Sequence, residues 1–301
     1  DRLLARLDDN ERALLAACAL VTQAVKVECR ITPAAEWLLD NFYLIEEQIR
    51  TARKHLPRSY DRELPRLSNS SRPGMPRVYD LALELISHSH GRVDIEGLRA
   101  FITSYQTISP LGLGELWAIP IMLRLALIEN LRRVVASITG GRRDRARADY
   151  WAEQLLAVAA SEPAQVVTVL AAMVKENPPL TDPFVSELAS RLQGQGPTLG
   201  FPITWIEQRL SERGQTLEQV FQRVSQDQAA SQVAIGNSIG SLRFLGATDW
   251  RIFVESMSVV EQTLRTDPAA VYATMSFATR NRYRQVVEEI AKRSRSSEQE
   301  V

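Results

Sequence analysis

The feature that most constrains the fold is a helical repeat of apolar residues along almost the whole chain, punctuated by helix start and stop signals. Thr32-Pro33 predicts a capped helix that continues to about Leu56. Ser109-Pro110, Asp182-Pro183 and Asp267-Pro268 repeat the same cap-plus-proline signal. No run of alternating β-branched residues lies between hairpin turns. The sequence therefore predicts an all-α fold, a bundle or array of about a dozen helices without a sheet.

Clusters of helix-breaking residues predict where the helices are divided. Gly140-Gly141, followed by the basic run RRDRAR, is expected to separate an N-terminal helical lobe, 1–139, from a C-terminal lobe, 144–301, unless the two form one continuous domain. Ser68 to Pro76 is expected to be a mobile loop, and Gly194 to Gly200 a third break. Arg293 to Val301 lose the apolar periodicity and are expected to fray or to run on into a neighbouring segment.

Composition excludes several classes of function. Lys and Arg together number 36, as do Asp and Glu, so the chain has no global field that would gather nucleic acid. The two cysteines, Cys18 and Cys29, form no Cys-x-x-Cys pair, and neither a disulfide nor a zinc site is expected. The longest apolar run, Ala13 to Val21, is too short to span a membrane. Because the chain begins at Asp1 without a methionine, we expect it to be a piece of a larger protein.

The segment 111–133 is predicted to be a central, buried helix. Its apolar stripe includes Trp117, and Arg124 lies in the middle of that stripe. An unpaired buried guanidinium is costly, so Arg124 should pair with a carboxylate or reach solvent along its stem. A structural ion pair is the favoured interpretation, and a ligand-facing role is the alternative. Pro120 predicts either a kink or the true start of this helix.

Two basic segments are candidates for partner binding. The cluster Arg142, Arg143, Arg145 and Arg147 is expected to be a solvated linker, and the alternative is a site for lipid headgroups or a nucleotide phosphate. Residues 279–292 predict a capped amphipathic helix whose Arg284–Glu288 and Glu288–Lys292 pairs neutralise one another.

Other polar and aromatic residues are better explained by structure than by catalysis. Glu36 and Asp40 share a helix face but are expected to be solvated. His88 and His90 are expected at an exposed helix end, where positive charge is favourable. The five tryptophans are expected in the core, with a carbohydrate groove as the alternative. They lie at positions 37, 117, 151, 205 and 250.

The sequence offers no catalytic residue. A phosphate loop, a dinucleotide fingerprint and a zinc-protease motif are absent, and no G-x-S-x-G nucleophile is expected. The chain also lacks the Asp-x-Asp and Gln-x-x-Arg-Trp motifs of processive glycosyltransferases. We expect no cofactor and no metal.

Several long stretches together resemble the N-terminal helical region of the cyclic β-1,2-glucan synthases, large inner-membrane proteins of Gram-negative bacteria. The stretches are Trp37 to Ile49 (WLLDNFYLIEEQI), Arg62 to Leu67, Arg77 to Ile86, Leu111 to Arg133, Asn237 to Arg243 and Asp249 to Ala291.

The resemblance implies a parent protein that polymerises glucose from UDP-glucose into a cyclic glucan linked to osmotic adaptation. It implies that the transferase and membrane domains lie downstream in the same polypeptide and that this segment faces the cytoplasm. A non-catalytic scaffold or interaction domain is the leading interpretation. The alternative is an α-helical carbohydrate-active or glucan-binding domain. A carbohydrate-active domain would present two carboxylates in a cleft flanked by exposed tryptophans.

Overall fold

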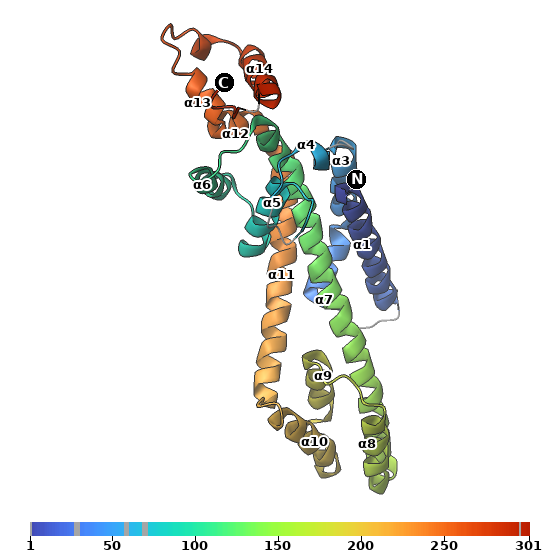
Figure 1. The fold of residues 1–301 in the computed structure, drawn as a ribbon. Helices are drawn as coiled ribbons and strands as arrows, with labels where there is room; N and C mark the ends of the chain where they lie inside the picture. Colours follow the sequence, from blue (N-terminus) through green and yellow to red (C-terminus); the bar gives the residue numbers. More distant parts are fainter. Residues whose placement is uncertain (1, 27–30, 57–59, 68–71, 295) are drawn as a thin grey trace. The chain divides into compact units, whose positions relative to one another are not determined.

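The computed structural model of the protein describes residues 2–26, 31–56, 60–67, 72–294 and 296–301, and within these ranges it is all-α. Helices α1 to α14 and three short 3-10 turns account for its regular structure, and Figure 1 shows no sheet. The predicted fold class is confirmed. Cys29 and Ser68 to Ser71 lie outside the described residues, so the expectations that rest on them stay predictions.

The chain divides into two compact units, each assembled from separated stretches of sequence. Unit 1 comprises residues 1–14, 41–132 and 234–301, and unit 2 comprises residues 15–40 and 133–233. Three helices have residues in both units: α1 (Arg2–Lys26), α7 (Leu113–Ser161) and α11 (Leu217–Ala247). Helices wholly in unit 2 are α2 (Pro33–Asp40), α8 (Val166–Lys175), α9 (Asp182–Leu192) and α10 (Gly200–Ser211). Those wholly in unit 1 are α3 (Phe42–His55), α4 (Tyr60–Glu63), α5 (Arg77–His88), α6 (Ile95–Gln106), α12 (Trp250–Met257), α13 (Val259–Leu264) and α14 (Phe277–Ser294).

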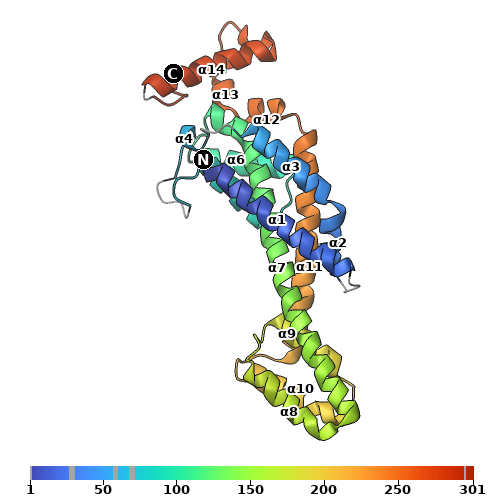
Figure 2. The ribbon, with the colours of Figure 1, turned by 90° about the vertical axis from the view of Figure 1, so that its right-hand side faces the viewer.

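The expected loop at Gly140-Gly141 is wrong, because α7 runs through both glycines without a break (Figure 2). A glycine pair costs about 2 kcal/mol of helix propensity relative to alanine, which the rest of a 49-residue helix outweighs. The compact units are discontinuous in sequence, whereas the predicted lobes, 1–139 and 144–301, are contiguous.

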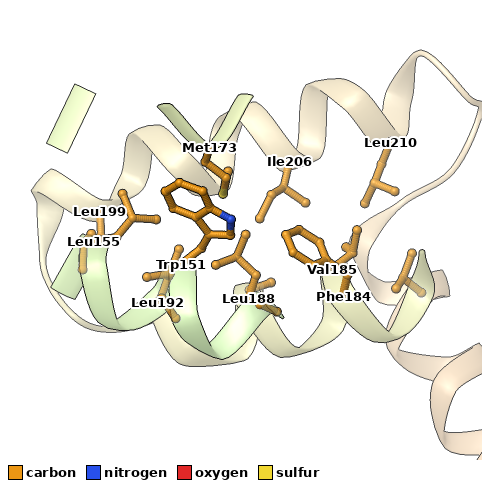
Figure 3. Close-up of a cluster of buried hydrophobic side chains, with 14 of the residues drawn as sticks. Trp151, Leu155, Met173, Phe184, Val185, Leu188, Leu192, Leu199, Ile206 and Leu210 are labelled. Atoms are coloured by element: carbon orange, nitrogen blue, oxygen red, sulfur yellow. The ribbon is translucent and has the colours of Figure 1, made fainter. Parts of the chain in front are cut away.

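A dry hydrophobic core holds unit 2 together. Trp151 of α7, Phe184 of α9 and Ile206 of α10 point toward one another in the close-up of Figure 3. Phe184 has no exposed surface, and Trp151 is 5% exposed. Helix packing against this cluster, rather than local propensity, stabilises the short helices α8 to α10.

Unit 1 has a polar contact at the centre of its packing. Glu129 of α7, which is 5% exposed, accepts a hydrogen bond of 2.6 Å from Arg6 Nε and one of 2.7 Å from the Tyr79 hydroxyl. Burial opposes ionisation of Glu129, but the bonds from Arg6 and Tyr79 outweigh it and hold its pKa below the ordinary range. The trio joins α1, α5 and α7.

The cap-plus-proline signals mark helix starts at two of four positions. Pro33 opens α2, with the Thr32 hydroxyl accepting from the Ala35 N–H at 3.3 Å, and Asp182-Pro183 opens α9. No α-helix begins at Pro110 or Pro268 among the described residues.

The failure at Pro268 has a local cause. The Asp267 carboxylate accepts the N–H groups of Ala269, Val271 and Tyr272, and so closes a turn instead of a helix. The helix expected from 33 to 56 is divided at Asn41 into α2 and α3. Pro120 lies inside α7 and does not start it.

A tight loop before α6 docks on α11 through small residues. Gly91 adopts φ +81°, and the Ser241 hydroxyl donates to the Gly91 carbonyl at 2.8 Å. A Cβ at Gly91 would lie 2.4 Å from the Ser238 hydroxyl oxygen. The position therefore needs glycine for both its conformation and its space.

Gly91→Ala is expected to destabilise unit 1 by about 1–3 kcal/mol because a left-handed backbone and a steric clash are imposed together. The matched control is Gly240→Ala on α11, where nothing lies within 4 Å of the added Cβ. That control should gain about 0.5–1 kcal/mol of helix stability. Urea unfolding of the two variants checks the sign; equal stabilities would contradict the docking contact.

Candidate functional site

A cavity of about 560 Å³ in unit 1 opens at the first turn of α7, and we call it the α7 cavity. Its walls come from α4, the start of α7, α13, α14 and the residues after α14. Its ionisable lining residues are Tyr60, Glu63, Arg77, Glu115, Glu288, Lys292 and Glu298. A cavity of this size with a few convergent polar groups is the usual form of a small-molecule site.

Two carboxylates satisfy the free N–H groups at the start of α7. Glu115 accepts from the Gly112 N–H at 2.9 Å, and its other contacts are two bonds of 2.6 and 2.7 Å from the Arg77 guanidinium. Glu298 accepts from the Leu113 N–H at 3.1 Å. Glu298 thus anchors the described residues 296–301 on α7, where fraying was expected, and the alternative that they run on into a neighbouring segment stays a prediction.

The α7 cavity has an excess of negative charge. Among the described lining residues, four glutamates face Arg77 and Lys292, so these residues together carry a formal charge of −2 (four minus two). Burial raises the pKa of Tyr60, and the charges of Glu288 and Glu63 raise it further. A hydrogen bond with Glu288, 2.7 Å from the ammonium, raises the pKa of Lys292. The predicted Glu288–Lys292 pair is confirmed.

Glu298→Gln is expected to become more stable than the original protein as the pH rises from about 4 to about 7. Burial raises the pKa of Glu298; the Leu113 N–H and Lys292 act against this shift, and Glu288 and Glu115 reinforce it. A raised carboxyl pKa means that stability is lost as pH rises through the folded-state value. Glutamine stays neutral and avoids this loss.

Urea unfolding across this pH range measures the difference between variant and original. The control is Glu300→Gln, because the Ser297 N–H lowers the pKa of Glu300 and the difference should then have the opposite sign. A Glu298→Gln difference that does not change with pH would contradict the prediction.

The described wall of the α7 cavity offers hydrogen-bonding and charged groups, among them the carboxylates of four glutamates. No group of three metal-ligating side chains occurs within the described part of the chain. The exposed tryptophans required by the carbohydrate-active interpretation are not in the cavity wall, where Tyr60 is the one aromatic residue among the described lining residues.

Arg124 and Trp117, both on α7, lie outside the wall of the α7 cavity. Arg124 is 8% exposed, and its Nε donates to the Gln48 side-chain oxygen at 2.8 Å. Among the described residues no carboxylate lies within ion-pair distance, so the expected ion pair is wrong, and burial lowers the pKa of Arg124. An amide oxygen takes the place of the predicted carboxylate. Trp117 is partly buried.

Arg142, Arg143 and Arg145 lie in unit 2, on a continuous helix instead of the expected linker. Arg142 donates to the Leu20 carbonyl at 2.7 Å. Arg145 lines a small cavity of about 70 Å³ that also contains Asp227. Arg143 is exposed. The five candidate residues thus belong to two units, with Arg124 and Trp117 in unit 1 and the three arginines in unit 2.

The residues expected on the surface are exposed: Glu36, Asp40, His88 and His90. Of the five tryptophans expected in the core, Trp151 is buried and Trp37 is 44% exposed. The tryptophans at 117, 205 and 250 are partly buried.

Sequence reasoning missed a buried charge network between α12, α13 and α14. Arg284 has no exposed surface, and its guanidinium contacts Glu255 at 2.9 Å and also Glu261. Arg280 bonds Glu255 at 2.9 Å. The predicted surface pair of Arg284 with Glu288 is therefore wrong. One sequence signal could have indicated that Arg284 is buried. Phe277, Arg284 and Ala291 follow one another at intervals of seven residues and so share one helix face.

Glu261 is the acceptor at the centre of this network. It takes hydrogen bonds from the Tyr272 hydroxyl at 2.7 Å and from Arg265 Nε at 2.8 Å. Burial opposes ionisation of Glu261, but these two bonds and the Arg284 charge outweigh it, so its pKa is lowered. The guanidinium of Arg284 also lies 5.3 Å from the centre of the Phe277 ring.

The expectation that the chain lacks a G-x-S-x-G pattern is wrong, since Gly236 to Gly240 (GNSIG) spells one. The pattern lies within α11, whereas a nucleophile elbow needs a sharp strand-to-helix turn. Ser238 has no exposed surface; it donates to the Ala234 carbonyl at 2.7 Å and accepts from Asn130 at 3.0 Å. It is a packing residue.

No helix in the described part of the chain is long and apolar enough to cross a bilayer. No protein-family profile matches the chain. A curated relative, the cyclic β-(1,2)-glucan synthase NdvB of Rhizobium meliloti (strain 1021), is 36% identical over 298 residues. The match covers 99% of this chain and 10% of the relative. The expected N-terminal position within such a synthase stays a prediction. The chain is thus similar, almost from end to end, to about a tenth of a cyclic β-1,2-glucan synthase, which confirms the resemblance inferred from its sequence.

Proposed function

We propose that this chain is a non-catalytic helical scaffold segment of a cyclic β-1,2-glucan synthase. The observation that supports it is the match over 99% of the chain to one tenth of a synthase, which leaves room for a transferase elsewhere in the polypeptide. In this proposal the segment lies at the cytoplasmic face of the inner membrane and contacts the transferase and membrane domains of the same chain. The polymerisation of glucose from UDP-glucose belongs to those domains.

Two assays test the scaffold function. The isolated chain should release no UDP from UDP-glucose and should not elongate β-1,2-glucan. Deletion of the segment from the full-length synthase should reduce the amount of assembled enzyme, with UDP release and ring closure falling together. Turnover by the isolated chain would overturn the proposal, as would a deletion that leaves synthesis intact.

A second candidate function, glucan binding, is favoured by the α7 cavity. Sugar hydroxyls form hydrogen bonds with carboxylates and with other hydroxyls. In this cavity of about 560 Å³, Glu63 and Glu288 supply carboxylates and Tyr60 supplies a hydroxyl. The shortage of aromatic rings counts against it, because bound sugars usually stack on them.

Calorimetry with β-1,2-glucans of defined length distinguishes the two functions. If glucan binds in the α7 cavity, Tyr60→Phe should weaken binding by about two- to tenfold through the loss of one hydrogen bond. Tyr43→Phe, an exposed tyrosine outside the cavity wall, is the control. An absence of heat with the original protein rejects glucan binding and leaves the scaffold function.

A further inference from the structure

Helix α14 exposes apolar side chains on one face, where the ring of Tyr283 also packs edge-on against the Tyr272 ring, with 6.0 Å between the ring centroids. Tyr283, Val286 and Ile290 are 49%, 48% and 46% exposed, and spacings of three and four residues place them on one face. We call this face the α14 stripe. Isolated exposed apolar residues are common on proteins, but an aligned set on one helix face is typical of a docking surface.

The buried side of the same helix carries charge, whereas a surface helix usually buries its apolar side chains and exposes its charged ones. Arg284 has no exposed surface and is fixed between Glu255 and Glu261. A helix free to rotate would bury Val286 and Ile290 and expose the arginine. The ion pairs therefore hold α14 in the rotation that presents the stripe.

Basic side chains flank the α14 stripe. Arg282 lies four residues before Val286, and Arg293 lies three after Ile290, so both are on the stripe's side of the helix. Both are exposed, and within the described residues neither has an ion-pair partner. A complementary partner would carry apolar residues at helical spacing and acidic residues beside them.

We propose that the α14 stripe docks an amphipathic helix with an acidic flank from another part of the same, longer polypeptide. The proposal rests on the proposed function, because the matched synthase has nine tenths of its length outside this segment. Two helices pack through apolar residues at this spacing on both partners, and Arg282 and Arg293 favour a partner with an acidic flank. This surface gives the scaffold a defined place to hold its parent enzyme.

Cysteine accessibility in the full-length protein tests the docking. Val286→Cys is introduced with Cys18→Ser and Cys29→Ser, and its maleimide labelling is followed by mass spectrometry. Labelling should be slower in the full-length protein than in the isolated chain by at least about tenfold, which corresponds to about 1.4 kcal/mol of docking free energy. Gln285→Cys, exposed on a different face of the helix, should label at similar rates in both.

Charge variants and detergent identify the partner. Arg282→Glu with Arg293→Glu should abolish the protection of position 286, whereas the Arg→Lys pair should keep it. Protection that is lost in detergent micelles would mean a lipid surface and would overturn the proposal, as would equal labelling in the two proteins. A full-length protein that makes cyclic glucan but shows no protection refutes the docking alone, whereas one that makes none points to failure of the proposed function.

Discussion

Arg284→Met is expected to destabilise unit 1 by about 3–5 kcal/mol, the usual cost of removing one partner from a buried ion pair. The substitution leaves Glu261, which is 1% exposed, without its fully buried cation, and Glu255 loses one of two arginines. Methionine fills much of the volume, so the loss is mainly electrostatic. Urea unfolding gives the free energy, and hydrogen exchange in α12 to α14 shows where protection is lost.

The matched control is Arg282→Met, two residues away on the same helix and exposed. It should change stability by less than about 0.5 kcal/mol, as surface substitutions usually do. Similar effects of the two variants would contradict the assignment of Arg284 as the anchor of α14. The Arg284→Met effect should also shrink as pH falls below about 4, because protonated Glu261 no longer needs a cation.

Phe184→Ala is expected to destabilise unit 2 by about 3–5 kcal/mol, through lost transfer free energy and the cavity that remains. Phe184 has no exposed surface and packs in the core shown in Figure 3. Its neighbours Leu188 and Ile206 come from α9 and α10, so collapse into the cavity would require two helices to move. Thermal or urea unfolding, followed by tryptophan fluorescence, measures the loss.

Phe201→Ala on α10 removes the same atoms from a side chain that is 63% exposed. It should cost less than about 0.5 kcal/mol. A large effect at Phe201 together with a small one at Phe184 would mean that the core of unit 2 is packed differently.

The all-α class was predictable because helical periodicity and caps are local signals that tertiary contacts reinforce. The helix start predicted from Thr32-Pro33 was correct because the cap is complete within four residues. Asp267-Pro268 failed because the same carboxylate can bond the N–H groups of a turn, and the sequence does not decide between the two. The break predicted at the glycine pair of α7 was wrong for another reason, since the length and packing of the helix outweigh the local propensity cost of the two glycines.

The candidate site was largely invisible in the sequence because its parts are far apart. Glu298 and Leu113 are separated by 185 positions, and no periodicity relates them. Arg284 was assigned to the surface because Glu288 offered a convenient partner one turn away, whereas its real partners are on α12 and α13. Arg124 was correctly placed in an apolar stripe, but the amide of Gln48 could not be anticipated as its partner.

The capping of α7 by Glu298 has a consequence for the order of folding during synthesis. All residues of unit 2 have been translated once residue 233 is made, whereas unit 1 draws its last stretch from residues 234–301. The Leu113 N–H in the first turn of α7 therefore gains its Glu298 partner only after a further 185 residues have been made. Until then the part of the cavity wall that α13, α14 and the residues after α14 supply is also missing. Unit 1 is the part of the chain whose folding is completed last.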